Sequence, residues 1–235
     1  MSNILQIVSL LKQSNRTVVL TGAGMSTESG VPDFRSSKGI WQQIDPLQVA
    51  TVDALENDYD TFHRFYTMRL QQLAQCKPHA GHIALAQLEK QGIISFVATQ
   101  NVDGFHTTAG STHVAELHGN IYDIRCHSCH QPHTVQQFIA KVHCTCGGLL
   151  RPGVVLFGEY LPEEAWIRTS REIEQADAVI VIGTSLQVSP VNQLPSMTRG
   201  KKIYINMEIS PNAIFDVMIE GSAKENILAL QNVLI

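Results

Sequence analysis

Four of the five cysteines gather in a span of 21 residues, with the spacing of a metal site. They form two pairs, Cys126-x₂-Cys129 and Cys144-x-Cys146, which are separated by fourteen residues. Four thiolates satisfy tetrahedral Zn²⁺ and leave no open position, so they predict a structural rather than a catalytic metal. The second pair is one residue tighter than the common C-x₂-C, which leaves His127, His130 and His143 as alternative ligands. Clustered cysteines favour a metal in a reducing compartment over disulfides.

A glycine-rich turn offers a second kind of chemistry, the binding of a phosphate. Residues 22–30 read GAGMSTESG and come directly after the apolar run 17–21. Glycines permit positive φ angles and let backbone N–H groups approach a phosphate, as a dinucleotide site requires. The spacing is G-x-G-x₅-G rather than G-x-G-x-x-G, and no acidic residue about 20 positions later ends a second strand. An ordinary tight turn therefore remains an alternative.

Polar side chains follow two further apolar runs. Gln100, Asn101 and Asp103 come after residues 93–99, and a small-residue turn at 183–185 follows residues 178–182. If these runs are parallel strands, their carboxyl ends meet at the edge where open α/β sheets bind ligands. An Asx-rich turn that caps a strand is the structural alternative for the first segment. The pattern thus predicts a cleft between the glycine-rich turn and the turn at 183–185.

The elements that would position these groups alternate between strands and helices. Apolar, β-branched runs predict buried parallel strands at 17–21, 93–99, 178–183 and 202–206. Periodic apolar residues predict helices at 3–12 and 78–91, the second with Pro78 in its first turn and Gly92 as its cap. A capping-box pattern at 222–225 starts a last helix. This alternation predicts an α/β fold with a doubly wound, Rossmann-like parallel sheet.

Two stretches interrupt the alternation and are expected to be insertions in one nucleotide-binding core. Residues 36–77 have a mostly helical pattern, and residues 121–150 hold the cysteines as a zinc-binding module. The rest of the chain, 1–35, 78–120 and 151–235, would then form the Rossmann-like domain. A chain of 235 residues is long enough for one such core with insertions.

Composition narrows the classes of function. Hydrophobic residues make up 44% and charged residues 16%, an ordinary globular balance. The 17 Lys and Arg against 21 Asp and Glu give a net charge of −4 without a basic run, which speaks against a nucleic-acid binder. The amphipathic start of the chain lacks a basic n-region and is far shorter than the roughly 20 residues that span a bilayer. We expect a monomeric cytoplasmic protein that does not bind membranes.

The residues after the glycine-rich turn make the pattern specific. Residues 30–35 read GVPDFR, and together with GAGMS they resemble the signature of the sirtuin family, G-A-G-x-S followed by G-[IV]-P-D-F-R. The likeness continues through TQNVDGFH at 99–106, LHGN at 117–120, RP and FGE within 151–159, and GTSL at 183–186. The chain therefore resembles the bacterial NAD-dependent protein deacylases of this family, which implies their Rossmann-like fold with a small zinc ribbon.

By this resemblance the chain uses NAD as a co-substrate beside a structural Zn²⁺. The residues implied to contact NAD are Gly22, Ala23, Gly24, Ser26, Thr27, Phe34, Arg35, Gln100, Asn101, Val102, Asp103, His118, Gly183, Thr184, Ser185, Asn206 and Ala223. Within this set, Asp103 and the Val102 backbone would hold the nicotinamide amide. Asn206 and Ala223 would meet the adenosine end.

The implied reaction transfers an acyl group from a protein lysine to NAD, which gives nicotinamide, O-acyl-ADP-ribose and free lysine. His118 matches the family's general base, and Asn101 would organise the ribose side and an ordered water. An imidazole's ordinary pKa of about 6.5 leaves a neutral fraction at cytoplasmic pH, as a base requires. Composition would not single out His118, which is one of ten histidines.

A tyrosine and an arginine three residues apart bear on the acyl group. Tyr66 and Arg69 would share a helix face, where this spacing is usually only a surface pair. Within the sirtuins, however, Y-x-x-R at this place resembles the members that remove succinyl and malonyl groups, with Arg69 gripping the distal carboxylate. Because Asp33 resembles the deacetylating members, we predict both deacetylation and desuccinylation.

Acylated-lysine proteins and peptides are the expected partners, bound by backbone pairing as an added strand. The substrate-binding residues implied beside Tyr66 and Arg69 are Val155, Phe157, Gly158, Glu159, Leu186 and Val188. Val155 and Phe157 would line an apolar tunnel for the lysine stem.

Two other classes of protein share parts of this pattern. An NAD-dependent dehydrogenase of Rossmann type would have the same fold, but the irregular glycine spacing and the missing ribose acid argue against it. A zinc-ribbon module that binds nucleic acid or protein would explain the cysteines alone, and the acidic balance argues against that.

Overall fold

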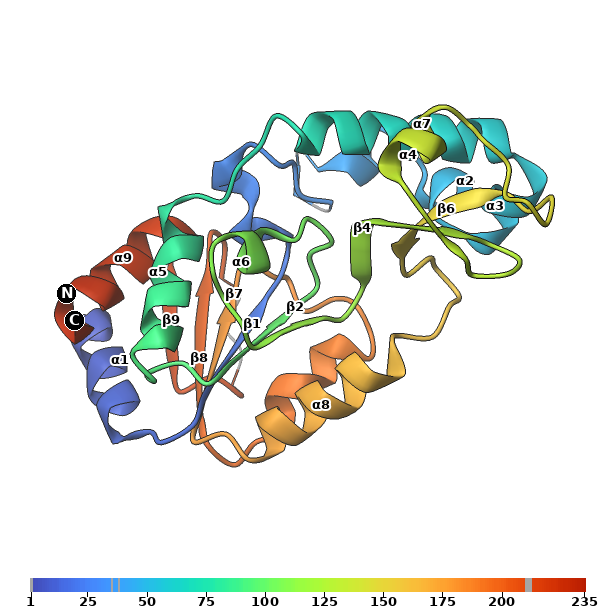
Figure 1. The fold of residues 1–235 in the computed structure, drawn as a ribbon. Coiled ribbons are helices and arrows are strands. Elements are labelled where there is room, and N and C mark those ends of the chain that lie inside the picture. Colours follow the sequence, from blue (N-terminus) through green and yellow to red (C-terminus); the bar gives the residue numbers. More distant parts are fainter. Residues whose placement is uncertain (1, 35, 38, 210–212) are drawn as a thin grey trace.

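The centre of the fold is a six-stranded sheet in which every strand pair is parallel (Figure 1). The computed structural model describes residues 2–34, 36–37, 39–209 and 213–235. The strands are β1 (Thr17–Thr21), β2 (Phe96–Thr99), β3 (Val114–Glu116), β7 (Ala178–Ile182), β8 (Lys201–Asn206) and β9 (Val217–Glu220). The order across the sheet is β3-β2-β1-β7-β8-β9, so the strand order reverses between β1 and β7. Open sheets bind ligands at such a switch point.

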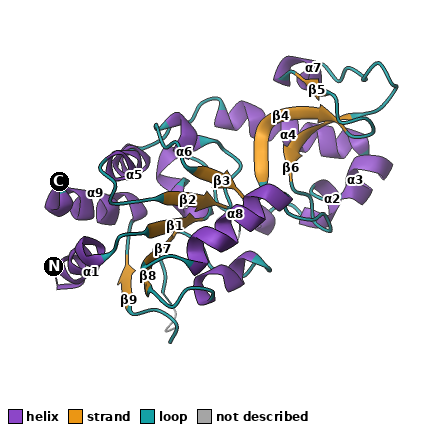
Figure 2. Cartoon of the chain, turned by 60° about the horizontal axis from the view of Figure 1, so that its bottom comes forward, coloured by secondary structure: helices purple, strands orange, loops and turns teal. Residues whose placement is uncertain are grey.

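Helices cover both faces of this sheet, which confirms the doubly wound prediction (Figure 2). One face carries α1 (Ser2–Gln13), α5 (Ala80–Lys90) and α9 (Ala223–Leu234). The other face carries α8 (Glu163–Glu174) and the 3₁₀ helix η4 (Val191–Ser196). β1 and β7 are buried at every residue, and for this reason their sequences are unbroken apolar runs.

The two predicted insertions pack against each other beside the carboxyl edge of the sheet (Figure 2). The cysteine-bearing stretch forms a three-stranded antiparallel sheet in the order β5-β4-β6, together with α7. Its elements are β4 (Gly119–Cys126), β5 (Pro132–His133), α7 (Val135–Ile139) and β6 (Leu150–Val154). The helical stretch supplies α2 (Pro46–Val49), α3 (Val52–Asn57) and α4 (Tyr59–Leu73). Phe62 and Leu70 of α4 share one buried cluster with Phe138 and Leu150.

Several element boundaries differ from the sequence expectation for identifiable reasons. Pro78 was expected in the first turn of a helix, but α5 starts at Ala80 with His79 as its N-cap. β2 starts at Phe96 and not at residue 93, because the N–H groups of Ile93 and Ile94 both bond to the Leu88 carbonyl at the end of α5. Among the described residues, no helix combines the length and apolar character of a membrane-spanning segment.

Candidate active site and metal centre

A cavity of about 810 Å³ lies along the carboxyl edge of the parallel sheet, facing the insertions. Thirteen of the residues expected at the cofactor line it, namely Ala23, Gly24, Thr27, Phe34, Gln100, Asn101, Val102, His118, Gly183, Thr184, Ser185, Asn206 and Ala223. The expected substrate residues Tyr66, Arg69, Val155, Phe157, Gly158, Glu159 and Val188 line it as well. The tertiary structure therefore gathers segments from most of the chain around one space.

The remaining expected residues lie elsewhere. Gly22, Ser26 and Asp103 are behind the cavity wall, and the Leu186 side chain packs against the core under α8. Arg35 lies outside the described residues.

The floor of the cavity is formed by two glycine turns packed backbone to backbone. The Gly24 N–H donates to the Gly183 carbonyl at 2.8 Å. A Cβ on Gly24 would lie 2.8 Å from the Gly183 Cα, and a Cβ on Gly183 would lie 2.3 Å from the Met25 nitrogen. Gly183 also has φ +61, in the left-handed region that favours glycine. The glycine spacing is thus set by the contact between these turns at the switch point.

His118 lies between β3 and β4 with one ring nitrogen held by the backbone. Its Nδ1 is 3.1 Å from the Gln100 carbonyl oxygen, and because a carbonyl can only accept, Nδ1 must donate. In the neutral ring the proton is then on Nδ1, and Nε2 keeps a free lone pair. Burial lowers the pKa of His118, against a smaller opposite effect of the Gln100 carbonyl. The imidazole is therefore neutral at physiological pH and able to take up a proton.

The side chains after β2 are tied to both glycine turns. The Gln100 side-chain amide donates to Thr184 Oγ1 at 3.0 Å. The Asn101 side-chain amide donates to Ser26 Oγ at 3.1 Å, and Ser26 Oγ donates to Asp103 Oδ2 at 2.7 Å. The other Asp103 oxygen accepts the Phe105 N–H at 3.0 Å. These bonds fix Asn101 on the cavity wall with Asp103 behind it, and they exceed what an Asx turn alone would make.

A row of three histidines behind this network, of which His82 and His106 are buried and His79 is half-buried, escaped the sequence reasoning. The ring centroids of His79 and His82 are 4.3 Å apart, and those of His82 and His106 are 5.0 Å apart. His106 Nε2 bonds to Thr21 Oγ1 at 2.9 Å. Burial lowers the pKa of His82 to about 2 and that of His106 to about 4, so both rings are neutral. The sequence did carry a signal for the burial of one of them. His82 falls on the same helix face as Leu85, in a periodic pattern of apolar residues that predicts a buried face.

The opposite wall of the cavity is aromatic. Phe34 stacks on Trp41 at 5.2 Å between ring centroids, and Trp41 stacks on Phe65 at 6.1 Å. Phe157 reaches the same indole at 6.5 Å. Trp41 and Phe65 were not predicted to belong to the site, because neither has a motif or a spacing that marks it. Their role follows only from the packing of residues 36–77 across the cavity mouth.

Tyr66 and Arg69 are buried in this wall, which overturns the interpretation of a surface pair. Their exposed fractions are 6% and 4%. The Arg69 guanidinium lies 5.6 Å from the centre of the Phe34 ring. Within the described chain, Arg69 Nη1 is buried and has no hydrogen-bond partner. Desolvation by burial lowers the pKa of this guanidinium.

Glu159, in contrast, has its carboxylate fully engaged. Arg151 holds it through Nη1 at 2.6 Å and Nη2 at 2.9 Å, and the Leu156 N–H donates to it at 2.7 Å. The Arg151 side chain is 2% exposed and that of Glu159 is 24% exposed, so this is a partly buried, bidentate pair. Glu159 therefore braces the segment 154–159 at the cavity rather than offering a free charge.

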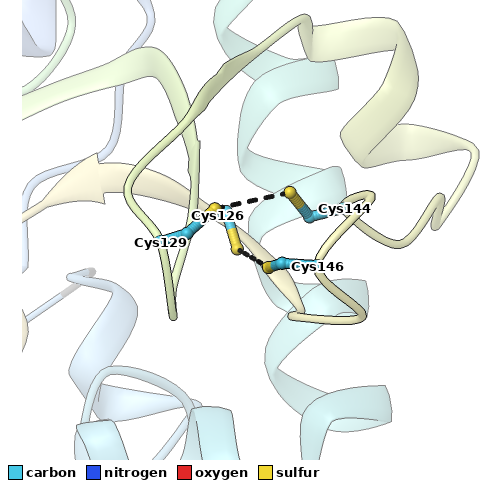
Figure 3. Close-up of side chains that lie close together, drawn as sticks. All are labelled: Cys126, Cys129, Cys144 and Cys146. Atoms are coloured by element: carbon cyan, nitrogen blue, oxygen red, sulfur yellow. Dashed lines mark hydrogen bonds between the residues drawn. The ribbon is translucent and has the colours of Figure 1, made fainter.

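The four cysteines meet at one point between β4, β6 and the loop after α7 (Figure 3). All four sulfurs lie within 4.8 Å of one another, with Cys126 to Cys146 and Cys129 to Cys144 each at 3.6 Å. A tetrahedral zinc with Zn–S bonds of about 2.3 Å requires sulfurs about 3.8 Å apart, so the set fits a closed structural Zn²⁺ site.

The histidines considered as alternative ligands are not part of this group. His127 Nε2 lies 3.1 Å from Glu56 Oε1, and His143 Nδ1 lies 3.4 Å from the Gly147 carbonyl. The four-cysteine set was therefore the correct expectation, and the tight Cys144-x-Cys146 spacing recruits no histidine from the described chain.

Comparisons with known proteins agree with this geometry. Residues 22–190 match the model of the Sir2 family. The chain is 46% identical over 206 residues to the NAD-dependent protein deacetylase of Oceanobacillus iheyensis, covering 86% of this chain and 87% of that protein. It is 40% identical over 229 residues to NAD-dependent protein deacylase 2 of Pyrobaculum aerophilum, covering 94% and 92%.

Solved structures extend the likeness to the whole fold. A Sir2 homologue in complex with ADP-ribose superposes with a TM-score of 0.93 at 37% identity, covering 97% of this chain and 95% of that one. A Sir2 with deacetylated p53 peptide and 3′-O-acetyl ADP-ribose also gives 0.93, at 35% identity and 98% coverage of both chains. The dehydrogenase and isolated zinc-ribbon alternatives are thereby excluded. The parallel sheet with its switch-point cavity, the four-cysteine centre and these matches together show that the chain belongs to the Sir2 family, the sirtuins.

Proposed function

We propose that this protein is an NAD-dependent protein-lysine deacylase that releases nicotinamide, O-acyl-ADP-ribose and free lysine. The observation that carries the proposal is the position of His118, whose ring lines the same cavity as both glycine turns. Its Nδ1 is fixed on the Gln100 carbonyl, which leaves Nε2 as the basic atom. Relatives named NAD-dependent protein deacetylases, and related structures with NAD⁺ or ADP-ribose products, support the assignment.

The cavity fits a dinucleotide in size and in chemistry. Backbone N–H groups of the two glycine turns would hold the phosphates, and Asn206 and Ala223 would border the adenosine. Gln100 and Asn101, already oriented by Thr184 and Ser26, would bind the nicotinamide-side ribose. NAD, when bound, supplies the ribose carbon and hydroxyls that accept the acyl group. This chain supplies a neutral imidazole that takes the hydroxyl proton at His118 Nε2.

The acylated lysine would enter along the segment after β6. The Val155 N–H donates to the His118 carbonyl at 2.9 Å, and the Phe157 N–H donates to the Ala50 carbonyl at 2.8 Å. These bonds hold Val155 and Phe157 as the apolar lining of the lysine channel, next to the catalytic histidine. Gly158 and the backbone of Leu186 to Val188 would pair with the peptide main chain, which predicts little sequence preference.

Arg69 supports a second acyl specificity, for succinyl and malonyl groups. A buried guanidinium with an unpartnered Nη1 is costly unless an anion reaches it. The distal carboxylate of a succinyl group has the charge and the two oxygens that a guanidinium fork binds best. Tyr66, one helical turn away and also on the cavity wall, would add a hydroxyl donor. The aromatic wall beside them still accepts the smaller acetyl group.

One assay tests the core proposal. The protein is incubated with NAD⁺ and peptides that differ only in carrying acetyl-lysine, succinyl-lysine or free lysine, and the products are followed by mass. We expect nicotinamide and the matching O-acyl-ADP-ribose with both acylated peptides and neither product with the free-lysine peptide. The appearance of NADH absorbance without nicotinamide would overturn the proposal in favour of hydride transfer.

We further propose a cytoplasmic monomer that binds neither nucleic acid nor membranes, as the acidic balance and the cysteine chemistry suggest. We also propose the division of the chain into a Rossmann-like domain (1–35, 78–120 and 151–235), a helical insertion (36–77) and a zinc module (121–150). Both insertions pack into one buried cluster beside the sheet, which supports separating them from the Rossmann-like domain.

A further inference from the structure

We propose that Glu28 is a positioning residue that ties the glycine-rich turn to the start of α9 and thereby shapes the adenosine end of the cofactor pocket. Glu28 lies in the short 3₁₀ helix Thr27–Ser29, one residue past the cavity-lining Thr27. This inference rests on the NAD site proposed above. It adds a residue that the family-like motifs do not single out.

The Glu28 carboxylate is held by residues far away in the sequence. Ser222 Oγ lies 3.0 Å from Oε1 and 2.9 Å from Oε2, and it donates its proton to the carboxylate. The Lys224 N–H donates to Oε2 at 3.0 Å, and Lys224 Nζ lies 3.8 Å from Oε1. The Glu28 side chain is 24% exposed, so water screens these contacts only in part.

These contacts are the ones that a helix N-terminus needs. Ser222 is the N-cap of α9, and its hydroxyl oxygen accepts the Glu225 N–H at 3.0 Å while its proton points to Glu28. The Lys224 N–H is one of the first four in the helix, which have no intrahelical partner. A carboxylate is also stabilised by the positive end of a twelve-residue helix. Glu28 thus completes the cap of α9 from another part of the chain.

The same turn is held from its other side by α5. His79 Nε2 bonds to the Met25 carbonyl at 2.7 Å, and His79 Nδ1 accepts the Gly81 N–H at 2.9 Å. A Cβ on Gly81 would come 3.1 Å from the Lys224 Cα, so the starts of α5 and α9 are in contact. The glycine-rich turn therefore contacts the N-termini of both helices, and Glu28 provides the contact between the turn and α9.

The link has a direct consequence for the pocket. Ala223 and Gly221, the two neighbours of Ser222, line the cavity, as do Ala23 and Glu28 itself. The bond between Glu28 and Ser222 therefore joins two walls of the adenosine end. It involves neither His118 nor the aromatic wall around Trp41. Loss of the link should weaken dinucleotide binding and leave the chemical step intact.

The test is a double-mutant cycle of Glu28→Ala and Ser222→Ala. The readouts are the dissociation constant for ADP-ribose by calorimetry, and KM for NAD⁺ and kcat at saturating acetyl-lysine peptide. We expect each single variant to raise the ADP-ribose constant and KM about tenfold, as the loss of a charge-assisted hydrogen bond allows, with kcat within about twofold. The double variant should lose clearly less than the sum of the two single losses, because the bond between Glu28 and Ser222 is removed in both single variants.

Asn226→Ala is the matched control, because its side chain bonds to the Ser222 carbonyl in the same first turn at 2.8 Å without reaching Glu28. We expect it to lower the melting temperature with little change in the ADP-ribose constant. An equal loss of binding in Asn226→Ala, or additive losses in the cycle, would overturn the positioning role in favour of general helix stability. Unchanged binding in Glu28→Ala would also overturn it and leave the deacylase proposal standing, whereas failure of the unmodified protein to bind ADP-ribose would overturn the NAD site itself.

Discussion

The two walls of the cavity differ in how completely their polar groups are paired. On the sheet side, Gln100, Asn101 and His118 each make a side-chain hydrogen bond that fixes their orientation. On the insertion side, the wall is aromatic, and Arg69 Nη1 has no hydrogen-bond partner in the part of the chain that the structure describes. The polar groups of the sheet wall are thus held in place by hydrogen bonds, while the insertion wall keeps a guanidinium nitrogen that pairs with no described residue.

This contrast has a structural cause. The sheet wall consists of turns that leave adjacent parallel strands, so backbone hydrogen bonds bring its side chains together. The insertion wall is made by α4 and the segment 154–159, which meet mainly through side-chain packing, with one backbone bond from Phe157 to Ala50 before α4. Substitutions on the sheet side should therefore affect all acyl substrates equally, and those on the insertion side should discriminate between them.

The largest effect is expected from His118→Ala. Removal of a general base lowers the rate about 10²- to 10⁴-fold. Because His118 serves every acyl group, deacetylation and desuccinylation should fall by the same factor, while the ADP-ribose dissociation constant changes little. A selective loss of one activity would contradict the expectation that substitutions on the sheet wall affect all acyl substrates equally.

The buried histidines behind the sheet wall predict acid sensitivity. In the folded chain the pKa of His82 is lowered to about 2 and that of His106 to about 4, below the ordinary value. As the pH falls through about 6.5, the unfolded chain takes up two protons that the folded chain cannot, so stability is lost toward acid. The free energy of unfolding should therefore fall steadily, by about 1 kcal/mol or more per pH unit, between about pH 6 and pH 4.5. Urea unfolding at several pH values measures this slope, and His106→Gln should make it shallower.

Arg69→Met should separate the acyl groups. Loss of hydrogen bonds to a carboxylate corresponds to about 1.5 to 3 kcal/mol, or about a 10- to 150-fold lower kcat/KM for the succinyl peptide. Deacetylation should stay within a few-fold, because an acetyl group has no distal charge. Arg64→Met, the same change at an exposed position of α4, is the control. Equal losses on both peptides would remove the carboxylate clamp.

The smallest effect is expected from Gly183→Ala, which tests the packing of the two glycine turns. The added Cβ would meet the Met25 nitrogen at 2.3 Å, an overpacking that costs about 1 to 3 kcal/mol of stability. Gly92→Ala shares the positive φ, at +74, but has nothing within 4 Å of the added Cβ. The difference between the two variants in chemical unfolding isolates the contact between the turns. Equal losses of unfolding free energy in the two variants would mean that the contact between the turns does not resist the added Cβ.

The strands, the glycine-rich turn and the metal ligands were predictable because each leaves a local trace in the sequence. β1 and β7 are buried on both faces and therefore read as unbroken apolar runs, and the cysteine spacing is fixed by tetrahedral coordination. Short edge strands such as β3 and β9 leave no such trace and were missed. The catalytic role of His118 came from family resemblance, since nothing in its local spacing separates it from nine other histidines.

By itself, the sequence determined the fold class, the central strands of the sheet, the zinc ligands and the family to which the chain is related. Only the tertiary structure decided which side chains face the cavity, because that depends on contacts between segments far apart along the chain. Asp103 lies behind Asn101, Leu186 packs against the core under α8, and Trp41 stacks in the aromatic wall. The bond between Glu28 and Ser222 spans 194 residues, and no local periodicity or motif encodes a contact at that separation.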